Sequence, residues 1–426
     1  MMPPRVFLFL QGPHGPFFAQ LARQLRMAGS VVWRVGFNTG DRVFWPDHTN
    51  YLPYKGSLTD WPADITQLLI DRNVSDIVLY GDTRPIHAHA IKAAQKHGAR
   101  VHVFEEGYLR PYWITYERDG SNGHSVLMDT SIAQMQALQD ARGFEPPIPP
   151  SHWGDMRQHV FYGALYHWFV LFWNRAYPQF QPHRSLNVKQ EFALYIKRLI
   201  LMPLQAAQRL IATRRIKSGS FPYHMALLQL EHDSSFQMHS PYNTQTQFIE
   251  QVITGFASGA PPHHHLVFKA HPLEDGRAPL RQDIERFAKQ HGLEQRVHWV
   301  RGGKLAGLLN DAVSAVTVNS TAGQQVLWRG IPLRAFGTAV YAKPELVSDQ
   351  SMSQFFANPQ KPNQQSYTRF RDFLLSTSQL PGSFYASKGR RQVLRRIVDM
   401  MLKEASPYAT PIVQSEADRQ QLHVVK

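Results

Sequence analysis

The chain has 426 residues, 43% of them hydrophobic and 18% charged, which is typical of a folded protein of two domains and excludes an intrinsically disordered one. It contains no cysteine, so a disulfide framework and a thiolate metal site are both excluded. A formal net charge of +14 predicts an anionic partner, which could be a nucleic acid, a phosphate-bearing ligand or an acidic membrane surface.

The N-terminal residues predict a Rossmann-like opening. The apolar run 6–10 leads into Gln11-Gly12-Pro13 rather than a small-residue cleavage site, so we interpret it as a first strand and not as a signal peptide. A helix over 17–28 and a strand over 31–35 follow. Backbone N–H groups of such a loop face a ligand. The loop does not match GxGxxG, so the expected occupant is an acceptor or a sugar and not a dinucleotide.

Two further predicted strands deliver acidic residues to the same edge of the sheet. The strand over 76–80 ends before Asp82 and Arg84, and the strand over 101–104 ends at Glu105-Glu106. Ligands of open α/β sheets bind beyond the carboxyl ends of the strands, and two neighbouring carboxylates resist joint ionisation, so these acids are candidate functional groups. The alternatives are an exposed acidic turn and a local ion pair between Asp82 and Arg84.

The segment 111–124 is aromatic and polar. Its rings suit a wall that contacts the apolar face of a sugar or an acceptor, because aromatic side chains pack against such faces. A packed loop would explain the same composition.

The middle of the chain contains two segments that could either contact a membrane or pack in the protein core. A proline-rich break at 145–150 precedes the aromatic run 161–173, which fits either a core helix or an interfacial one. A basic amphipathic helix over 196–217 either binds anionic lipid or packs on its own domain. No window reaches the roughly 18 uncharged apolar residues that span a bilayer. We therefore expect a cytoplasmic protein with peripheral membrane contact.

Regular structure restarts after Gly219-Ser220. Strands are predicted over 227–230 and 266–270, with a helix over 245–257 between them. The second strand ends at His271-Pro272, where a histidine could hydrogen-bond or protonate a phosphate. The run 263–265 is all histidine, but three consecutive residues of a strand do not converge on one metal ion.

A hydroxyl-rich turn follows the later strands, predicted over 297–300 and 315–318. The turn runs from Asn319 to Gly323 before a helix over 324–329. Hydroxyls and backbone N–H groups at a helix start can bind an anion. A plain helix N-cap is the alternative.

These elements predict three segments. An N-terminal Rossmann-like domain on the acceptor side spans 1–220 and carries a helical insert at about 150–217. A nucleotide-sugar-binding domain spans 221–380, and a C-terminal helix and tail span 381–426.

Five motifs together resemble the KpsS-like branch of bacterial capsule polysaccharide biosynthesis and export proteins, understood as β-Kdo glycosyltransferases. They are Gln11-Gly12-Pro13, Gly81-Asp82-Thr83-Arg84-Pro85, Phe104-Glu105-Glu106-Gly107-Tyr108-Leu109-Arg110-Pro111, Lys269-Ala270-His271-Pro272 and Val318-Asn319-Ser320-Thr321. The likeness runs from about residue 5 to residue 345. It implies an α/β fold of the GT-B type, with two Rossmann-like domains facing a central cleft, and a retaining, metal-independent transfer of Kdo from CMP-Kdo to a phosphatidylglycerol-type lipid.

The motif order is also similar to that of GT-B bacterial sialyltransferases, which implies roles for single residues. The catalytic carboxylate falls on Glu105, with Glu106 and Asp82 as alternatives, and His271 contacts the donor phosphate. The remaining assignments divide into a nucleotide-sugar group and an acceptor group. The first comprises Lys269, His271, Pro272, Asn319, Ser320 and Thr321; the second comprises Gln11, Gly12, Arg84, Tyr108 and Arg110.

The resemblance also implies partners. The nucleotide-sugar donor and a lipid acceptor at the inner face of the inner membrane are expected, and a second Kdo transferase and the capsule export machinery are further candidates. No cofactor, metal or nucleic acid is expected. The competing functions are a non-catalytic component of capsule export and a transferase of another CMP-sugar.

Overall fold

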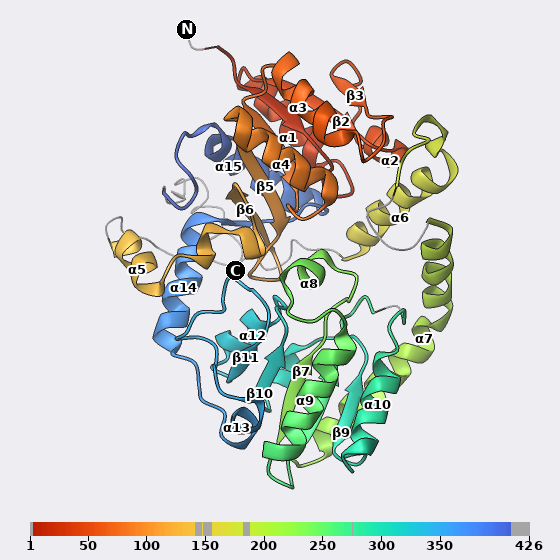
Figure 1. Ribbon diagram of the computed structural model, residues 1–426, viewed down its shortest axis with the longest axis vertical. Coiled ribbons are helices and arrows are strands. Elements are labelled where there is room, and N and C mark those ends of the chain that lie inside the picture. Colours follow the sequence, from red (N-terminus) through yellow and green to blue (C-terminus); the bar gives the residue numbers. More distant parts are fainter. Residues whose placement is uncertain (1–2, 141–146, 148–155, 182–187, 275, 410–426) are drawn as a thin grey trace. The chain divides into compact units, whose positions relative to one another are not determined.

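The computed structural model in Figure 1 describes residues 3–140, 147, 156–181, 188–274 and 276–409. The chain forms two compact units. The first comprises Met1–Val126, Met135–Val188 and Asp372–Lys426, and the second comprises Leu127–Gln134 and Lys189–Arg371. Each contains a largely parallel sheet covered by helices, so the predicted GT-B-like α/β fold with two Rossmann-like units is confirmed. The central cleft expected between the units remains a prediction.

The first unit is built on a 7-stranded sheet in the order β12-β6-β5-β4-β1-β2-β3. Strands β1 to β5 are parallel, whereas β6 is antiparallel to β5 and to β12. The strands are β1 (Val6–Phe9), β2 (Val31–Gly36), β3 (Tyr51–Pro53), β4 (Asp76–Tyr80), β5 (Arg100–Glu106), β6 (Trp113–Arg118) and β12 (Gln379–Pro381). The helices are α1 (Phe17–Met27), α2 (Thr39–Val43), α3 (Trp61–Asp71), α4 (Pro85–His97), α6 (Met156–Phe172) and α15 (Ser387–Leu402).

Alternate residues of β1 enter two different cores of the first unit. Phe7 and Phe9 pack with side chains of α1 and α15, whereas Leu8 and Leu10 pack with side chains of α3 and α4. Successive side chains of a strand point to opposite faces, so a strand covered by helices on both faces is apolar throughout. This explains why the apolar runs of β1 and β4 were predictable.

The C-terminal segment returns to the first unit. β12 pairs with β6, with Gln379 opposite Thr115, and α15 packs on α1. β12 covers an edge that β6 would otherwise expose, and the helix predicted within 381–426 corresponds to α15. The predicted division of the chain at 220 and 380 remains a prediction. The helix α14 (Gln364–Thr377) leads into this return, and the helix α5 (Ile132–Asp140) contains another of the points at which the chain passes from one unit to the other.

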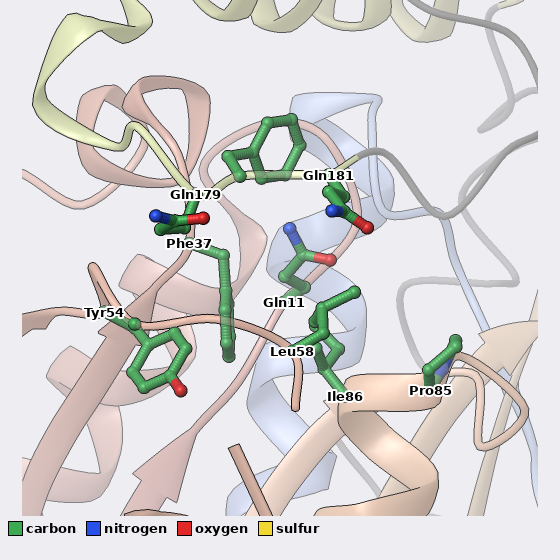
Figure 2. Close-up of a pocket in the computed structure, with 10 residues that line it drawn as sticks. Gln11, Phe37, Tyr54, Leu58, Pro85, Ile86, Gln179 and Gln181 are labelled. Carbon is green, nitrogen blue, oxygen red and sulfur yellow. The ribbon is translucent and has the colours of Figure 1, made fainter. Parts of the chain in front are cut away.

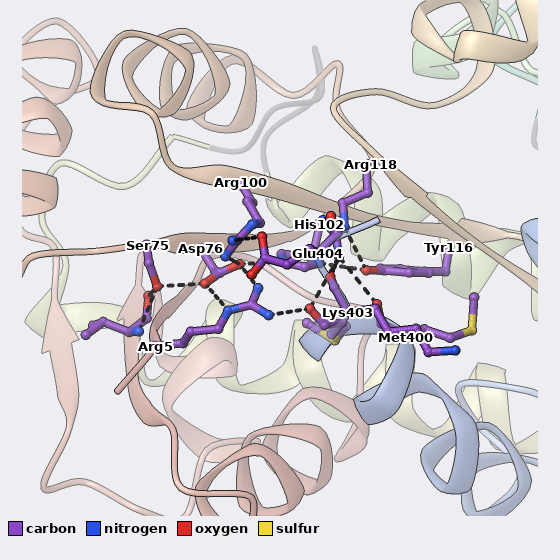
Figure 3. Close-up of polar contacts among 12 residues, drawn as sticks. Arg5, Ser75, Asp76, Arg100, His102, Tyr116, Arg118, Met400, Lys403 and Glu404 are labelled. Carbon is purple, nitrogen blue, oxygen red and sulfur yellow. Dashed lines mark hydrogen bonds and ion pairs between the residues drawn. The ribbon is translucent and has the colours of Figure 1, made fainter. Parts of the chain in front are cut away.

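A buried polar network ties the amino end of β4 to this returning segment (Figure 3). Asp76 is fully buried and accepts hydrogen bonds from Arg5 Nε at 2.9 Å, Ser75 Oγ at 2.7 Å and His102 Nε2 at 2.8 Å. Arg118 donates to the last carbonyls of α15, including that of Met401 at 3.3 Å. Charged donors at a helix C-terminus satisfy carbonyls that have no partner within the helix, so this network joins sheet and helix.

The second unit contains a 5-stranded parallel sheet in the order β11-β10-β7-β8-β9. The strands are β7 (Tyr223–Leu227), β8 (His265–Lys269), β9 (Val297–Val300), β10 (Ala312–Thr317) and β11 (Leu333–Ala335). The other helices are α7 (Val188–Ser218), α8 (Ser234–His239), α9 (Gln245–Gly259), α10 (Leu280–Gln290), α11 (Ala306–Leu309), α12 (Gly323–Trp328) and α13 (Met352–Ala357). Its main core lies between the sheet and the helices α9, α10 and α13.

Two local predictions differ from the structure, and for a third the structure agrees with one of the two alternatives at the residues described. The aromatic segment 111–124 contains β6, in which Trp113 and Tyr116 are buried, so those rings form core and not an open wall. The strand predicted over 227–230 is β7, which ends at Leu227. The predicted apolar stripe of 196–217 faces solvent at Leu204 and Ile211, where it is described, although the nearby Ile216 is buried.

The proline-rich break at 145–150 lies outside the described residues except for Pro147. Within the described ranges, none of the helices combines the length and the apolar character that crossing a membrane requires.

Candidate active-site edges of the two sheets

The carboxyl edge of the first sheet has a topological switch point between β1 and β4. From β1 the chain moves outward through β2 and β3, and it then crosses to β4 and β5 on the other side. Loops that diverge in this way leave a crevice, which is where open α/β sheets bind ligands. Gln11 and Gly12 follow β1 at this point, and Gly81 and Asp82 follow β4.

The structure brings together two predicted acceptor residues, Gln11 and Arg84. Arg84 Nη1 donates to Gln11 Oε1 at 3.4 Å, and Gln11 Nε2 donates to Asp41 Oδ2 at 3.1 Å. Arg84 also lies over the ring of Tyr80, with Cζ 5.7 Å from the ring centroid. The predicted alternative paired Arg84 with Asp82, but the guanidinium turns to Gln11 instead.

Beside Gln11 lies a small cavity of about 50 Å³ that is open to solvent (Figure 2). Its walls are mostly aromatic and aliphatic, and amide groups supply the polar contacts. The lining residues are Gln11, Phe37, Tyr54, Gly56, Leu58, Pro85, Ile86, Gln179, Phe180 and Gln181. Its mixed lining is that of a small-molecule site, but its volume accommodates only a small part of a ligand. Of these residues only Gln11 was predicted as a site residue, although Phe37 and Tyr54 each directly follow a strand, which was the available signal.

The two adjacent glutamates at the end of β5 have different surroundings. Glu106 Oε1 accepts a hydrogen bond from Tyr80 at 3.2 Å, and Tyr385 also hydrogen-bonds Glu106. Burial, reinforced by the charge of Glu106, raises the pKa of both tyrosines well above the ordinary value. Glu105 is partly exposed and lies beside Gly81, where an added Cβ would be 3.1 Å from Glu105 Oε2. Glu106 is therefore anchored by tyrosines, whereas Glu105 lies against the loop that follows β4 at the switch point.

Asp82 holds a loop in the structure. Its side chain is buried, and Oδ2 accepts hydrogen bonds from Ser121 N at 2.8 Å and from His124 Nδ1 at 3.1 Å. These contacts fix the turn after β6. A catalytic role for Asp82 remains a prediction, and its contacts favour the positioning of this loop.

A second buried carboxyl group, Glu117 of β6, was missed. It accepts hydrogen bonds from Ser125 Oγ at 2.9 Å, from Tyr108 Oη at 3.1 Å and from Tyr408 Oη. Burial raises the pKa of Glu117 to about 7, against these hydrogen bonds, which lower it. Tyr108, predicted for the acceptor group, is buried, and its backbone N–H donates to Gln379 Oε1 at 2.9 Å; a contact with the acceptor remains a prediction. Arg110, by contrast, is exposed, and its Nε donates to Gly107 O at 3.2 Å.

The second sheet has its switch point between β7 and β10. Asn319, predicted to bind the donor, joins these strand ends: its N–H donates to Gln229 Oε1 at 3.0 Å and its Nδ2 to Ser235 O at 2.9 Å. Ser320 Oγ accepts from Ala322 N at 3.2 Å, so its hydroxyl stabilises the turn before α12. The next residue, Thr321, is partly exposed in this turn.

Lys269 and His271 leave β8 with different contacts. Lys269 is buried, and its Nζ donates to the carbonyl oxygens of Ala270, at 3.3 Å, and Gly302. Burial, with a contribution from Arg209, lowers its pKa to about 8.

His271 is partly exposed, and its Nδ1 accepts from Leu273 N at 3.1 Å. The neutral ring then carries its proton on Nε2, which makes Nε2 a donor suited to a phosphate oxygen. Pro272 follows, with its Cα 3.6 Å from where a Cβ on Gly302 would lie.

Neighbouring histidines of the run 263–265 contact different partners, as expected for successive residues of an extended chain. His264 Nδ1 lies 2.9 Å from His224 Nε2, and His265 Nδ1 lies 2.8 Å from His298 Nε2. Among the described residues no group of three or more His, Asp or Glu side chains is placed to hold a metal ion. A metal-independent reaction remains an expectation.

Comparison with known proteins identifies relatives over most of the chain. The family model described as "Capsule polysaccharide biosynthesis protein" matches residues 75–385. The capsule polysaccharide export protein KpsS of Escherichia coli is 31% identical over 384 residues, which cover 89% of this chain and 96% of that protein. The capsule polysaccharide modification protein LipB of Neisseria meningitidis serogroup A is 30% identical over 390 residues, which cover 89% of this chain and 91% of that protein.

Among solved structures, the Thermosulfurimonas dismutans KpsC β-Kdo 2,7 transferase is similar with a TM-score of 0.44 and 13% identity. The match covers 93% of this chain and 100% of that chain. We draw nothing about the site from so distant a likeness.

Proposed function

The chain belongs to the capsule polysaccharide biosynthesis protein family, and from this premise we propose that it is a glycosyltransferase that moves Kdo from CMP-Kdo to a phosphatidylglycerol-type lipid. The observation that carries the proposal is the position of Glu105 beside Gly81, at the switch point of a Rossmann-like sheet. A solvent-accessible carboxylate at this point is where a sugar carbon would be attacked. The reaction would take place at the inner face of the inner membrane, where the lipid acceptor lies.

The proposed reaction retains the configuration of the Kdo carbon. Glu105 attacks that carbon as the bond to the phosphate oxygen of CMP breaks, and the departing electron pair stays on the phosphate. The acceptor hydroxyl then displaces the carboxylate and gives its proton to a base. The sugar carbon passes through an oxocarbenium-like state at each step, which a carboxylate stabilises. The Nε2–H of His271 suits the charge that develops on the departing phosphate.

The cavity beside Gln11 supports an amphiphilic acceptor. Its apolar walls, which include Phe37 and Leu58, suit a short apolar part of an acceptor, and its amide groups suit hydroxyls. The guanidinium of Arg84, bonded to Gln11, adds positive charge next to this cavity. A glycerol phosphate with an acyl chain combines the three features.

The reaction is tested by incubating the purified protein with CMP-Kdo and a fluorescent lysophosphatidylglycerol. Release of CMP together with a lipid product heavier by one Kdo unit is the expected result. A normal capsule made by cells that carry a Glu105→Gln, His271→Ala double variant would contradict the proposal. It would favour a non-catalytic export component, which is how the Escherichia coli relative is named.

Substitution His271→Ala is expected to lower kcat/KM for CMP-Kdo by about 100-fold, because it removes a donor to the leaving phosphate. The matched control is His291→Ala, which changes an exposed histidine after α10. Its kcat/KM should stay within about twofold of the wild-type value. Steady-state CMP release measures both variants. Equal activity of the His271 variant and the wild type would remove this residue from the donor site.

Substitution Gly81→Ala is expected to lower transfer about tenfold while costing only about 1 kcal/mol of stability. Gly81 has φ of +70°, and a Cβ would lie 3.1 Å from Glu105 Oε2. Gly98→Ala is the matched control, because Gly98 has φ of +78° at the end of α4 and nothing lies within 4 Å of its added Cβ. Both variants should melt at similar temperatures, and only the first should lose activity. A loss of the same size in both would mean that backbone strain, and not the displacement of Glu105, is responsible.

A further inference from the structure

Helix α6 is apolar on two opposite faces. One face packs within the first unit, where Val170 is buried and the ring of Tyr166 stacks on His14 with centroids 4.2 Å apart. Tyr166 also accepts a hydrogen bond from Asn38 Nδ2 at 2.7 Å. These contacts fix the helix on α2 and on the loop after β1, next to the switch point.

The opposite face of α6 presents large rings to solvent. Phe161, Trp168 and Phe172 are spaced by seven and four residues, so they share one side of the helix, and they are 61%, 51% and 51% exposed. Trp173 follows at 64% exposure, and the rings of Trp168 and Phe172 lie 4.4 Å apart. We call Phe161, Trp168, Phe172 and Trp173 the aromatic stripe. Single exposed apolar residues are normal, but a contiguous patch of this kind marks an interaction surface.

The charges around the aromatic stripe favour an anionic partner. The sequence from Met156 to Gln190 contains no aspartate or glutamate. Arg157 and Arg175 stand near the two ends of the stripe, and both are exposed. A helix rich in Trp and Phe with flanking arginines matches the composition of helices that lie in the plane of a membrane interface. Anionic headgroups would complement both the arginines and the +14 net charge of the chain.

We propose that α6 is the membrane-docking element of the first unit, with the aromatic stripe inserted among the headgroups of an anionic bilayer. The inner face of the same helix contacts the residue that borders the candidate acceptor cavity, since Tyr166 Oη lies 3.4 Å from Gln11 Nε2. Docking through α6 would hold the cavity about one helix diameter from the lipid surface. The proposed function enters this inference only through the identity of the acceptor. Vesicle binding can be measured without any transfer reaction.

The test is cosedimentation of the full-length protein with vesicles. The wild type should bind phosphatidylcholine vesicles that contain phosphatidylglycerol and bind pure phosphatidylcholine at least about tenfold more weakly. The triple variant Phe161→Ser, Trp168→Ser, Phe172→Ser should bind the anionic vesicles about 10- to 100-fold more weakly than the wild type. Trp328→Ser is the matched control, because Trp328 is 61% exposed at the end of α12 in the second unit, and it should bind as the wild type does. Unchanged binding of the triple variant would overturn the inference, as would equal losses in the triple variant and the control.

The outcome can be separated from that of the proposed reaction. If the reaction occurs, the triple variant should keep full transfer to a detergent-dispersed lysophosphatidylglycerol and lose transfer to acceptor embedded in vesicles. Equal loss with both forms of acceptor would show damage to the site and contradict a docking role. If the wild type transfers no Kdo at all, the proposed function fails, and the vesicle measurements still decide whether α6 docks.

Discussion

Replacing Glu105 with glutamine is expected to reduce Kdo transfer by about 1,000-fold, because the amide keeps the size of the side chain and removes the charge that stabilises the sugar carbon. Glu105 is partly exposed beside Gly81, so the substitution should leave the melting temperature within about 2 °C of the wild type. Product formation from CMP-Kdo and lysophosphatidylglycerol, with a thermal melt, measures both quantities.

The neighbouring Glu106 provides the matched control. Its carboxylate accepts hydrogen bonds from Tyr80 and Tyr385, and a glutamine oxygen can accept the same bonds. Glu106→Gln should therefore lose no more than about tenfold in activity. If Glu106→Gln abolished transfer and Glu105→Gln did not, the catalytic role would move to Glu106.

The sequence located the edge of the sheet but could not assign the contacts made there. The parallel strands β4 and β9 match the predicted ranges, because each is a short run of strand-forming residues between turns; β4 is buried, and β9 is a half-buried edge strand. The turns after such strands fall at the binding edge by topology alone. For this reason Gln11, Arg84 and Glu105 could be named as candidates in advance.

Long-range pairing explains most of what the sequence could not predict. The segment Trp113–Arg118 has a polar C-terminal half, so a loop was one interpretation of it. In the structure Glu117 is buried and accepts a hydrogen bond from Tyr408, which lies 291 positions later in the chain. Asn319 and Lys269 were assigned to the donor through the family resemblance. In the structure their polar atoms bind backbone and side-chain groups of neighbouring elements. Proximity to an edge follows from local pattern, whereas the choice of partner depends on the tertiary fold.

Removal of the Asp76 carboxylate is expected to destabilise the protein by about 3–5 kcal/mol, because Arg5 and His102 would keep buried donors without their acceptor. Asp76 is fully buried, and although burial opposes its charge, hydrogen bonds from His102 and Arg5 hold its pKa well below the usual value. The variant is Asp76→Ala, and Asp71→Ala, at the exposed end of α3, is the matched control, with an expected change of about 0.5 kcal/mol. Urea unfolding at neutral pH measures the difference.

The pH dependence of stability separates this network from simple packing. Burial lowers the pKa of His102 from 6.5 to about 4, although its hydrogen bond to Asp76 acts in the opposite direction. The stability that His102 contributes is complete above pH 6.5, which is its pKa in the unfolded chain, and is lost as the pH falls toward 4. The reason is that the unfolded chain binds a proton in this range and the folded chain does not. His102 alone should cost the wild type about 2 kcal/mol between pH 7 and pH 5. In Asp76→Ala the pKa of His102 should be lower still, since the acceptor that favours its protonation is gone, so the loss over this interval should be at least as large. The contrary result is an Asp76→Ala variant that loses less stability between pH 7 and pH 5 than the wild type does. It would mean that His102 had become solvated in the variant, and the buried network would then not be the source of the acid sensitivity.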